Sequence, residues 1–359
     1  MAYLLSPLFV NIARRYNFFD RPAGIKAHAQ PTPFIGGVLV FVSFWSVIFA
    51  GIFLAHFLAH RRHDLGASLE MLEGIIFLTP KIFWIFVGSA VMLGVGFLDD
   101  QEHWTPMQKL SGQVVAVLIL MSQGLSINLA DALGIPGYIF TFIWVLLIVN
   151  AFNFIDSLDG HCTGIAIISA IMLFWITQII HQTLTAMFLV AFMGALLGFF
   201  PKNFKPAKIF LGDNGSLFIG YMMAAFTLLC RYYTPKATYA TAFIPVLIFG
   251  VPIYDTVSVI AVRLFRGVPP WTGDRNHFAH RLVKMGMGDR AAVVFSYLIA
   301  ITIGHIAVLL TQVNWFGAIL IGIIFFFMIT IIALLEYYAA RRLRIAEEIA
   351  AGLERNKKG

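Results

Sequence analysis

Long apolar runs separated by short polar stretches dominate the chain. Ten of them are long enough, once their ends reach into the flanking loops, to cross a bilayer as helices: 35–58, 82–98, 110–123, 138–149, 163–180, 184–200, 216–230, 239–262, 291–310 and 316–335. An eleventh run, 4–12, is too short to span by itself and lacks the pattern of a signal peptide. We expect it to be the inner half of a first helix whose outer half is missing or abbreviated. The pattern predicts an all-α, polytopic membrane bundle of ten or eleven transmembrane helices.

Composition supports the same class. Hydrophobic residues make up 60% of the 359 residues and charged residues 12%, whereas a soluble domain carries about 25% charged residues. No Gly/Ser-rich or Pro-rich linker divides the chain. We predict one transmembrane domain over residues 1–340 and a basic cytoplasmic helix or tail over 341–359, lying on the membrane surface. Cys162 and Cys230 are far apart and are expected to pack rather than to form a disulfide or bind metal.

The positive charges indicate the topology. With 4–12 counted as the first helix, one set of loops holds all but five of the 25 Lys and Arg residues, the exceptions being Arg61, Arg62, Lys81, Arg231 and Lys236. The positive-inside rule places the side that is richer in Lys and Arg at the cytoplasmic face of the plasma (inner) membrane. The net charge of +7 is then a topology signal and an attraction for anionic lipid or substrate. No nucleic-acid partner is expected.

Polar residues gather at this cytoplasmic side. They are Asp99, Asp100, Asn150, Asn153, Asp156, Asp159, Asp213, Asp255, Arg275, His277 and His280. Asn150, Asn153, Asp156 and Asp159 advance in threes and would share one face if their helix continues. Each residue alone has an ordinary explanation as a helix cap, a hydrated helix end or a loop histidine. Acids at the edge of a bilayer are nevertheless costly unless they pair, hydrate or hold a cation, so the collection predicts a polar site.

The residue types suggest the chemistry of that site. Carboxylates and an Asn amide are hard oxygen ligands that suit Mg²⁺ or Mn²⁺, and Mg²⁺ is typically completed by substrate phosphates. The glycines of Gly212–Gly215 let the backbone approach a phosphate, and the helix that follows offers free N–H groups. Lys26, Lys208 and Arg275 would balance the charge of a diphosphate, and His277–His280 is suited to contact phosphate or sugar. We predict phosphoryl transfer on a pyrophosphate-containing metabolite.

Six motifs follow one another along the chain: Asp20-Arg-Pro with Lys26-Ala-His28 and Pro31 to Gly37, Gly96 to Asp100, Asn150 to Gly160, Phe210 to Ser216, Pro252 to Asp255, and Asp274 to Leu282. In order and in cytoplasmic placement, they resemble the polyprenyl-phosphate N-acetylhexosamine-1-phosphate transferases, the superfamily of the WecA, TagO and MraY types. The resemblance runs nearly end to end. It implies a Mg²⁺-dependent enzyme that transfers a sugar 1-phosphate from a UDP-sugar to undecaprenyl phosphate in the membrane and releases UMP.

The resemblance also implies roles for individual residues. Asp213 and Asn153 would hold the metal, with Asp100 close by as the third implied metal ligand, and Asp99 would deprotonate or position the lipid phosphate. The implied catalytic set is Asp99, Asp100, Asp156, Asp213, His277 and His280, and the substrate-binding set is Lys26, His28, Asn150, Asp159, Phe210 and Arg275. Within these sets, Asp156, Asp159 and Phe210 would line the uridine end, while Lys26 and the histidine segment would contact phosphates and sugar.

The histidine motif bears on the sugar. The WecA type has a further His where Ala279 stands, and the consecutive histidines of the MraY type, followed by Phe and Glu, are absent. This favours UDP-GlcNAc as donor, in the first membrane step of a cell-envelope polysaccharide such as lipopolysaccharide. The alternative within the class is the UDP-MurNAc-pentapeptide phosphotransferase of peptidoglycan synthesis. An ion-coupled transporter with carboxylates along its path is the alternative from another class. Both a monomer and a homodimer are compatible with the sequence.

Overall fold

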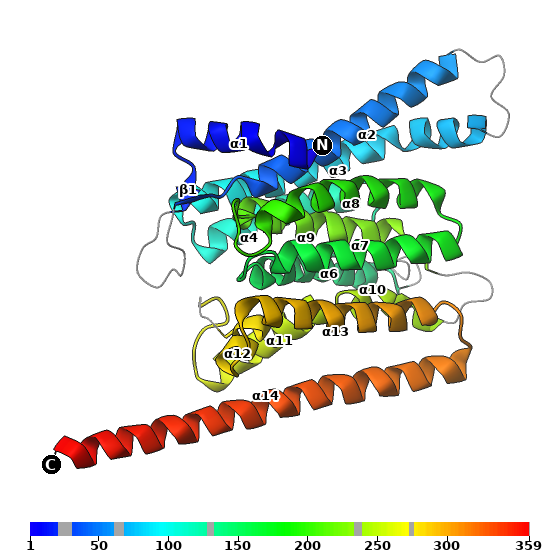
Figure 1. Ribbon diagram of the computed structural model, residues 1–359. Coiled ribbons are helices and arrows are strands. Elements are labelled where there is room, and N and C mark those ends of the chain that lie inside the picture. The colour runs from blue at the N-terminus through cyan, green and yellow to red at the C-terminus, as the bar shows by residue number, and fades with distance from the viewer. Residues whose placement is uncertain (21–30, 61–67, 128–132, 233–238, 273–275, 359) are drawn as a thin grey trace.

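The computed structural model describes residues 1–20, 31–60, 68–127, 133–232, 239–272 and 276–358. Helices lie side by side in a bundle, with α12 and the C-terminus at the same end (Figure 1). A short antiparallel pair, β1 (Phe19–Asp20) and β2 (Thr32–Pro33), follows the first helix. The all-α class predicted from the apolar runs is confirmed.

Most helices follow the predicted runs, but α3 begins well before its run 82–98, and the run 239–262 is divided among η1, α10 and α11. Their bounds are α1 (Ala2–Tyr16), α2 (Gly36–His60), α3 (Ser68–Glu102), α4 (Pro106–Ser122), α6 (Ile135–Ile155), α7 (His161–Ile179), α8 (Thr183–Asn203), α9 (Gly212–Leu229), the 3-10 helix η1 (Tyr239–Phe243), α10 (Ile244–Ile248), α11 (Gly250–Phe265), α12 (Phe278–Lys284), α13 (Asp289–Leu309) and α14 (Trp315–Lys358).

Seven helices in the described ranges are long and apolar enough to cross a membrane, namely α2, α3, α6, α7, α8, α13 and α14. An eighth span results if η1 and α10 are joined to α11, although the pair is bent by 72°. Pro252 lies in the first turn of α11, where its missing N–H costs nothing, so the break precedes it. The polytopic membrane class is confirmed. The shorter helices α1, α4 and α9 match the remaining predicted runs, and the count of ten or eleven crossings stays a prediction.

Helix α9 lies at the centre of the bundle. Its residues from Asn214 to Leu228 are all buried, and it packs mainly against α3, α6 and α2. Two glycines allow this closeness at the start of α9: a Cβ on Gly37 would collide with the backbone of Gly215, and one on Gly96 with the backbone of Asn214. Glycine is required where backbones approach so closely. The ends of α2 and α3 therefore fix the first turn of α9.

Helix α14 lies at the edge of the bundle (Figure 1), with almost none of its most apolar segment buried. The helix continues without a break through the predicted tail to Lys358. No change of secondary structure marks residue 340, so the division into residues 1–340 and 341–359 stays a prediction.

Candidate active site

The start of α4 positions a lysine. Thr105 caps the helix by accepting the N–H of Gln108, whose side chain accepts the N–H of Thr105 in return, and Pro106 follows the cap. This reciprocal arrangement and a proline at the first helical position both favour a helix start. Lys109, one turn into α4, therefore leaves the helix at a fixed point near the end of α3.

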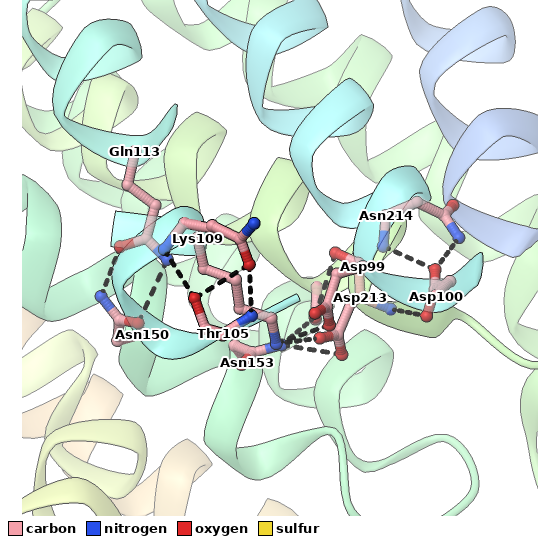
Figure 2. A network of polar contacts seen from close by, with 11 residues as sticks. Asp99, Asp100, Thr105, Lys109, Gln113, Asn150, Asn153, Asp213 and Asn214 are labelled. Atoms are coloured by element: carbon pink, nitrogen blue, oxygen red, sulfur yellow. Dashed lines mark hydrogen bonds and ion pairs between the residues drawn. The ribbon is translucent and has the colours of Figure 1, made fainter. Parts of the chain in front are cut away.

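Lys109 lies between two aspartates from other helices (Figure 2). Its Nζ is 2.6 Å from Oδ2 of Asp99 at the end of α3 and 2.5 Å from Oδ2 of Asp213 in the first turn of α9. Burial disfavours the ammonium, but attraction by the two carboxylates outweighs it and raises the pKa of Lys109. Carboxylates from the end of α3 and from the distant start of α9 thus converge on the one positive charge of Lys109.

Asp100 holds the start of α9. Its Oδ1 accepts the backbone N–H of Asp213 at 2.9 Å, and its Oδ2 accepts the backbone N–H of Asn214 at 3.0 Å and the side-chain amide of Asn214 at 2.6 Å. The first N–H groups of a helix have no partner within the helix, and a carboxylate there is stabilising. Asp213 itself is not the cap, since the cap position is Leu211. We therefore assign Asp100, predicted as a metal ligand, a positioning role.

Two asparagines of α6 have different partners. Asn153 donates from Nδ2 to Oδ1 of Asp213 at 3.0 Å and to Oγ of Ser216 at 2.9 Å. Asn150, one turn earlier, exchanges two hydrogen bonds with Gln113 of α4, at 2.8 and 3.2 Å (Figure 2). Asn153 thus belongs to the aspartate cluster, which we define as Asp99, Asp100, Lys109, Asn153 and Asp213. Asn150 joins two helices, and its predicted role in substrate binding stays a prediction.

The helix that carries these asparagines does not continue. Helix α6 ends at Ile155, and the chain turns through Gly160, whose φ of 77° is in the left-handed region, before α7 begins. Asn150 and Asn153 therefore lie on one helix, whereas Asp156 and Asp159 follow its end and do not share a helical face with them. Burial and then repulsion by the carboxylates of Asp213 and Asp100 raise the pKa of Asp156 well above its usual range, which places it near the cluster. Asp159 accepts the backbone N–H of Ala207 at 3.0 Å and so holds the loop before α9.

A carboxylate orients the first predicted histidine. Asp255 of α11 is buried, with 1% of its surface exposed. Its Oδ2 lies 2.8 Å from Nδ1 of His277, and its Oδ1 accepts the backbone N–H of Phe278. Because a carboxylate only accepts, Nδ1 carries the proton and Nε2 remains for other contacts. His280 lies one turn further along, partly exposed on α12.

Comparison with known proteins identifies the family. A profile of glycosyl transferase family 4 matches residues 82–231. The chain is 29% identical to a probable undecaprenyl-phosphate N-acetylglucosaminyl 1-phosphate transferase of Bacillus subtilis, covering 90% of this chain and 86% of that protein. It is 28% identical to a decaprenyl-phosphate N-acetylglucosaminephosphotransferase of Mycobacterium leprae (94% and 88%), and 32% identical to a phospho-N-acetylmuramoyl-pentapeptide-transferase of Shouchella clausii (72% and 78%). The chain belongs to glycosyl transferase family 4.

The resemblance predicted from the motifs is thereby confirmed. The region that matches glycosyl transferase family 4 contains the whole aspartate cluster, whereas His277 lies beyond it. Lys26, His28 and Arg275, predicted to bind substrate, lie outside the described residues. Phe210 is half-buried, and its backbone N–H and C=O bond to Pro33 and Gly36, which ties the β2 segment to the start of α9.

Sequence reasoning missed several members of the site. Lys109 is one of the Lys and Arg residues used above to predict the topology, and the sequence alone predicts no further role for it. Asn214 and Ser216 lay within a quoted motif, but no role was predicted for either. Their partners, Asp100 and Asn153, are distant in sequence, so spacing alone carries no signal of these contacts.

The cluster can be tested for its fit to a divalent cation. Asp99 and Asp213 face the same ammonium, so their carboxylates converge on a position that attracts positive charge. Within the described part of the chain, no group of three or more His, Cys, Asp and Glu side chains is arranged to hold a metal by itself. Mg²⁺ commonly binds through one or two carboxylates plus substrate phosphates. The residues therefore fit Mg²⁺ accompanied by a phosphate-bearing substrate.

Proposed function

We propose that this enzyme transfers N-acetylglucosamine 1-phosphate from UDP-GlcNAc to undecaprenyl phosphate and releases UMP. The reaction would be the first membrane step in the synthesis of a cell-envelope polysaccharide, at the cytoplasmic face of the inner membrane. The relatives in Bacillus subtilis and Mycobacterium leprae, whose names give a polyprenyl phosphate as acceptor and N-acetylglucosamine phosphate as the group transferred, support this assignment over most of both chains.

The observation that carries the proposal is the convergence of Asp99 and Asp213 on Lys109 at the ends of three helices. The charges of Asp213 and Asp100 raise the pKa of Asp156, after the larger effect of its burial, so Asp156 belongs to the same region. An ion-coupled transporter would instead need carboxylates spread along a path through the bilayer. A single cluster at one end of the bundle favours an enzyme that meets its substrates at the membrane surface.

Charge balance supports a divalent cation. Several carboxylates and one ammonium would repel a nucleotide diphosphate unless more positive charge were present. We propose that Asp213 and Asn153 hold Mg²⁺, with Mn²⁺ as an alternative. When bound, the ion would neutralise phosphate charge and stabilise the charge that develops during transfer.

The remaining residues act on the substrates directly or by positioning. In the transfer, an oxygen of the lipid phosphate attacks the phosphorus attached to the sugar, and the bond from that phosphorus to the bridging oxygen breaks. UMP is the leaving group. Asp99 would accept a proton from the lipid phosphate or hold it in line, and Lys109 would then neutralise the attacking phosphate. His277, held through Nδ1 by Asp255, would present Nε2 to the diphosphate or sugar.

A second donor has one observation in its favour. The relative in Shouchella clausii, a phospho-N-acetylmuramoyl-pentapeptide-transferase, is 32% identical, although the match covers less of both chains than the matches to the N-acetylglucosamine enzymes. The donor in that case would be UDP-MurNAc-pentapeptide.

One assay separates these proposals. Purified protein is incubated with undecaprenyl phosphate, Mg²⁺ and, in parallel, UDP-GlcNAc, UDP-GalNAc or UDP-MurNAc-pentapeptide, and UMP release is measured. We expect release with UDP-GlcNAc that depends on both the lipid and Mg²⁺. Release with the pentapeptide donor alone would select the second candidate. No release from any donor by folded protein would refute the enzyme assignment.

A further inference from the structure

A second charged network lies apart from the aspartate cluster. Glu336 of α14 accepts the Nε–H of Arg281 of α12 at Oε1, at 2.8 Å, and the hydroxyl of Tyr254 of α11 at Oε2, at 2.7 Å. Arg281 also donates from its second terminal nitrogen to Oγ of Ser258, at 2.7 Å. One glutamate on the last helix thus connects α14 to α11 and α12.

The location of Glu336 needs an explanation. It lies within the candidate membrane span of α14, a helix with almost no apolar surface buried against the bundle. The Glu336 side chain is nevertheless only 12% exposed and that of Arg281 only 16%. A carboxylate in a membrane helix is costly, and such residues usually serve a function with a named partner. Here the partner belongs to the segment that carries the histidines.

Arg281 holds that segment together. Its side chain donates from Nη1 to the backbone carbonyl of Asn276 at 2.7 Å, and its backbone N–H donates to the carbonyl of His277 at 2.9 Å. Glu336 therefore fixes the Arg281 side chain, which holds the residues just before α12. Asp255 of α11 fixes the ring of His277. His277 is thus constrained from both sides.

Apolar packing alone holds α12 weakly. The helix has seven residues, of which Phe278, Ala279 and Leu282 are buried. Phe278 and Leu282 form a small cluster with Ala292 and a few partly buried side chains, separate from the main core. A short helix with a small core depends on its polar contacts for a fixed position. The carboxylates of Glu336 and Asp255 supply these contacts.

We propose that Glu336 is a positioning residue for the transferase reaction: through Arg281 it holds α12 so that His277 and His280 stay in place for the diphosphate. The last transmembrane helix then contributes to catalysis by positioning α12. The role in turnover rests on the proposed function, whereas the clamp on α12 does not.

The test compares Glu336→Ala and Glu336→Gln with Tyr337→Phe, a matched control at the exposed neighbouring position. We expect Glu336→Ala to lower kcat about 10-fold or more, with KM for undecaprenyl phosphate within about twofold of wild type. Glu336→Gln, whose amide oxygen can still accept from Arg281 and whose amide N–H can donate to the Tyr254 hydroxyl, should retain more activity than Glu336→Ala. Tyr337→Phe should behave as wild type. Wild-type kcat in Glu336→Ala would overturn the proposal.

A double-variant comparison separates positioning from a general structural role. If Glu336 acts through the histidine segment, Glu336→Ala should add little to the loss caused by His277→Ala. A double variant whose loss of kcat equals the product of the two single-variant losses would overturn the proposal.

Hydrogen exchange measured by mass spectrometry gives a readout without activity. Peptides covering residues 276–284 should exchange faster in Glu336→Ala than in Tyr337→Phe, while peptides of α9 should be unchanged. Unchanged exchange in residues 276–284 would refute the proposed contact between Glu336 and α12, whether or not the enzyme is active. Absence of UMP release by the wild-type protein would refute only the proposed function.

Discussion

The carboxylate of Asp100 accepts the backbone N–H of Asp213 at 2.9 Å, although the two residues lie on different helices. The adjacent residue, Asp99, faces Lys109 instead. The two consecutive acids at the end of α3 therefore have different tasks. Asp100 fixes the start of α9, and Asp99 contacts the same Lys109 ammonium as Asp213 of α9.

This division predicts different effects for the same substitution. Asp100→Asn should lower the free energy of unfolding by about 1.5–3 kcal/mol, because an amide cannot replace both charge-assisted hydrogen bonds to the N–H groups of α9. Asp99→Asn should lower turnover by about 100-fold with little change in Tm. Thermal unfolding in detergent and UMP release would be measured for both. An Asp100→Asn protein that unfolds at the wild-type temperature would contradict the assigned role.

Lys109 should compete with a divalent cation for the same carboxylates. Lys109→Met leaves Asp99 and Asp213 without their ammonium, so the metal-free variant should unfold at a lower temperature than wild type. Added Mg²⁺ should then raise the Tm of the variant more than that of wild type. Turnover should remain low even with Mg²⁺, because the phosphate-neutralising group is lost. An equal Mg²⁺ effect on both proteins would show that the ion binds elsewhere.

Asp156 should make stability depend on pH. Burial and the neighbouring carboxylates raise its pKa, so native Asp156 keeps a proton that the unfolded chain releases near pH 4. The native state then binds more protons than the unfolded state, and stability falls as pH rises above that value. The Asp156→Asn variant has no carboxyl group at this position and so does not lose stability in this way as pH rises. In EDTA, its Tm should exceed that of wild type by an amount that grows from pH 4 and levels off once native Asp156 ionises. A difference independent of pH would contradict this.

Asn150 should affect stability more than substrate binding. Its amide pairs with Gln113, so Asn150→Ala leaves a polar partner unsatisfied between α4 and α6 and should cost about 1–3 kcal/mol. KM for the UDP-sugar should change by less than about twofold. A large rise in KM at unchanged Tm would instead support the substrate-binding role predicted from the sequence.

The sequence predicted the helices well because each carries its own signal. Apolar runs located α2, α6, α7, α8 and α13 to within a few residues. The break between α10 and α11 was missed, since 239–262 reads as one apolar run and the bend at Phe249 leaves hydropathy unchanged. The break between the runs 138–149 and 163–180 was predicted, but α6 continues to Ile155 before the chain turns through Gly160, so only the end of the helix was placed too early.

Site residues were predictable by type and motif, but their partners were not. Asp99, Asp213 and Asn153 were chosen for their oxygen ligands, and they do lie together. Lys109 was overlooked because its meaning comes only from two carboxylates on other helices. Glu336 was overlooked for the same reason, since Arg281 lies 55 positions earlier in the chain.

The most direct test is UMP release by purified wild-type protein and by Asp213→Asn, each with UDP-GlcNAc and undecaprenyl phosphate over a range of Mg²⁺ concentrations. We expect wild-type release to require Mg²⁺ and to saturate with it. The variant should lose about 1,000-fold in rate, because it lacks the carboxylate placed between Lys109 and Asn153. Wild-type rates from Asp213→Asn, or release that is indifferent to Mg²⁺ and to EDTA, would contradict the role of the aspartate cluster.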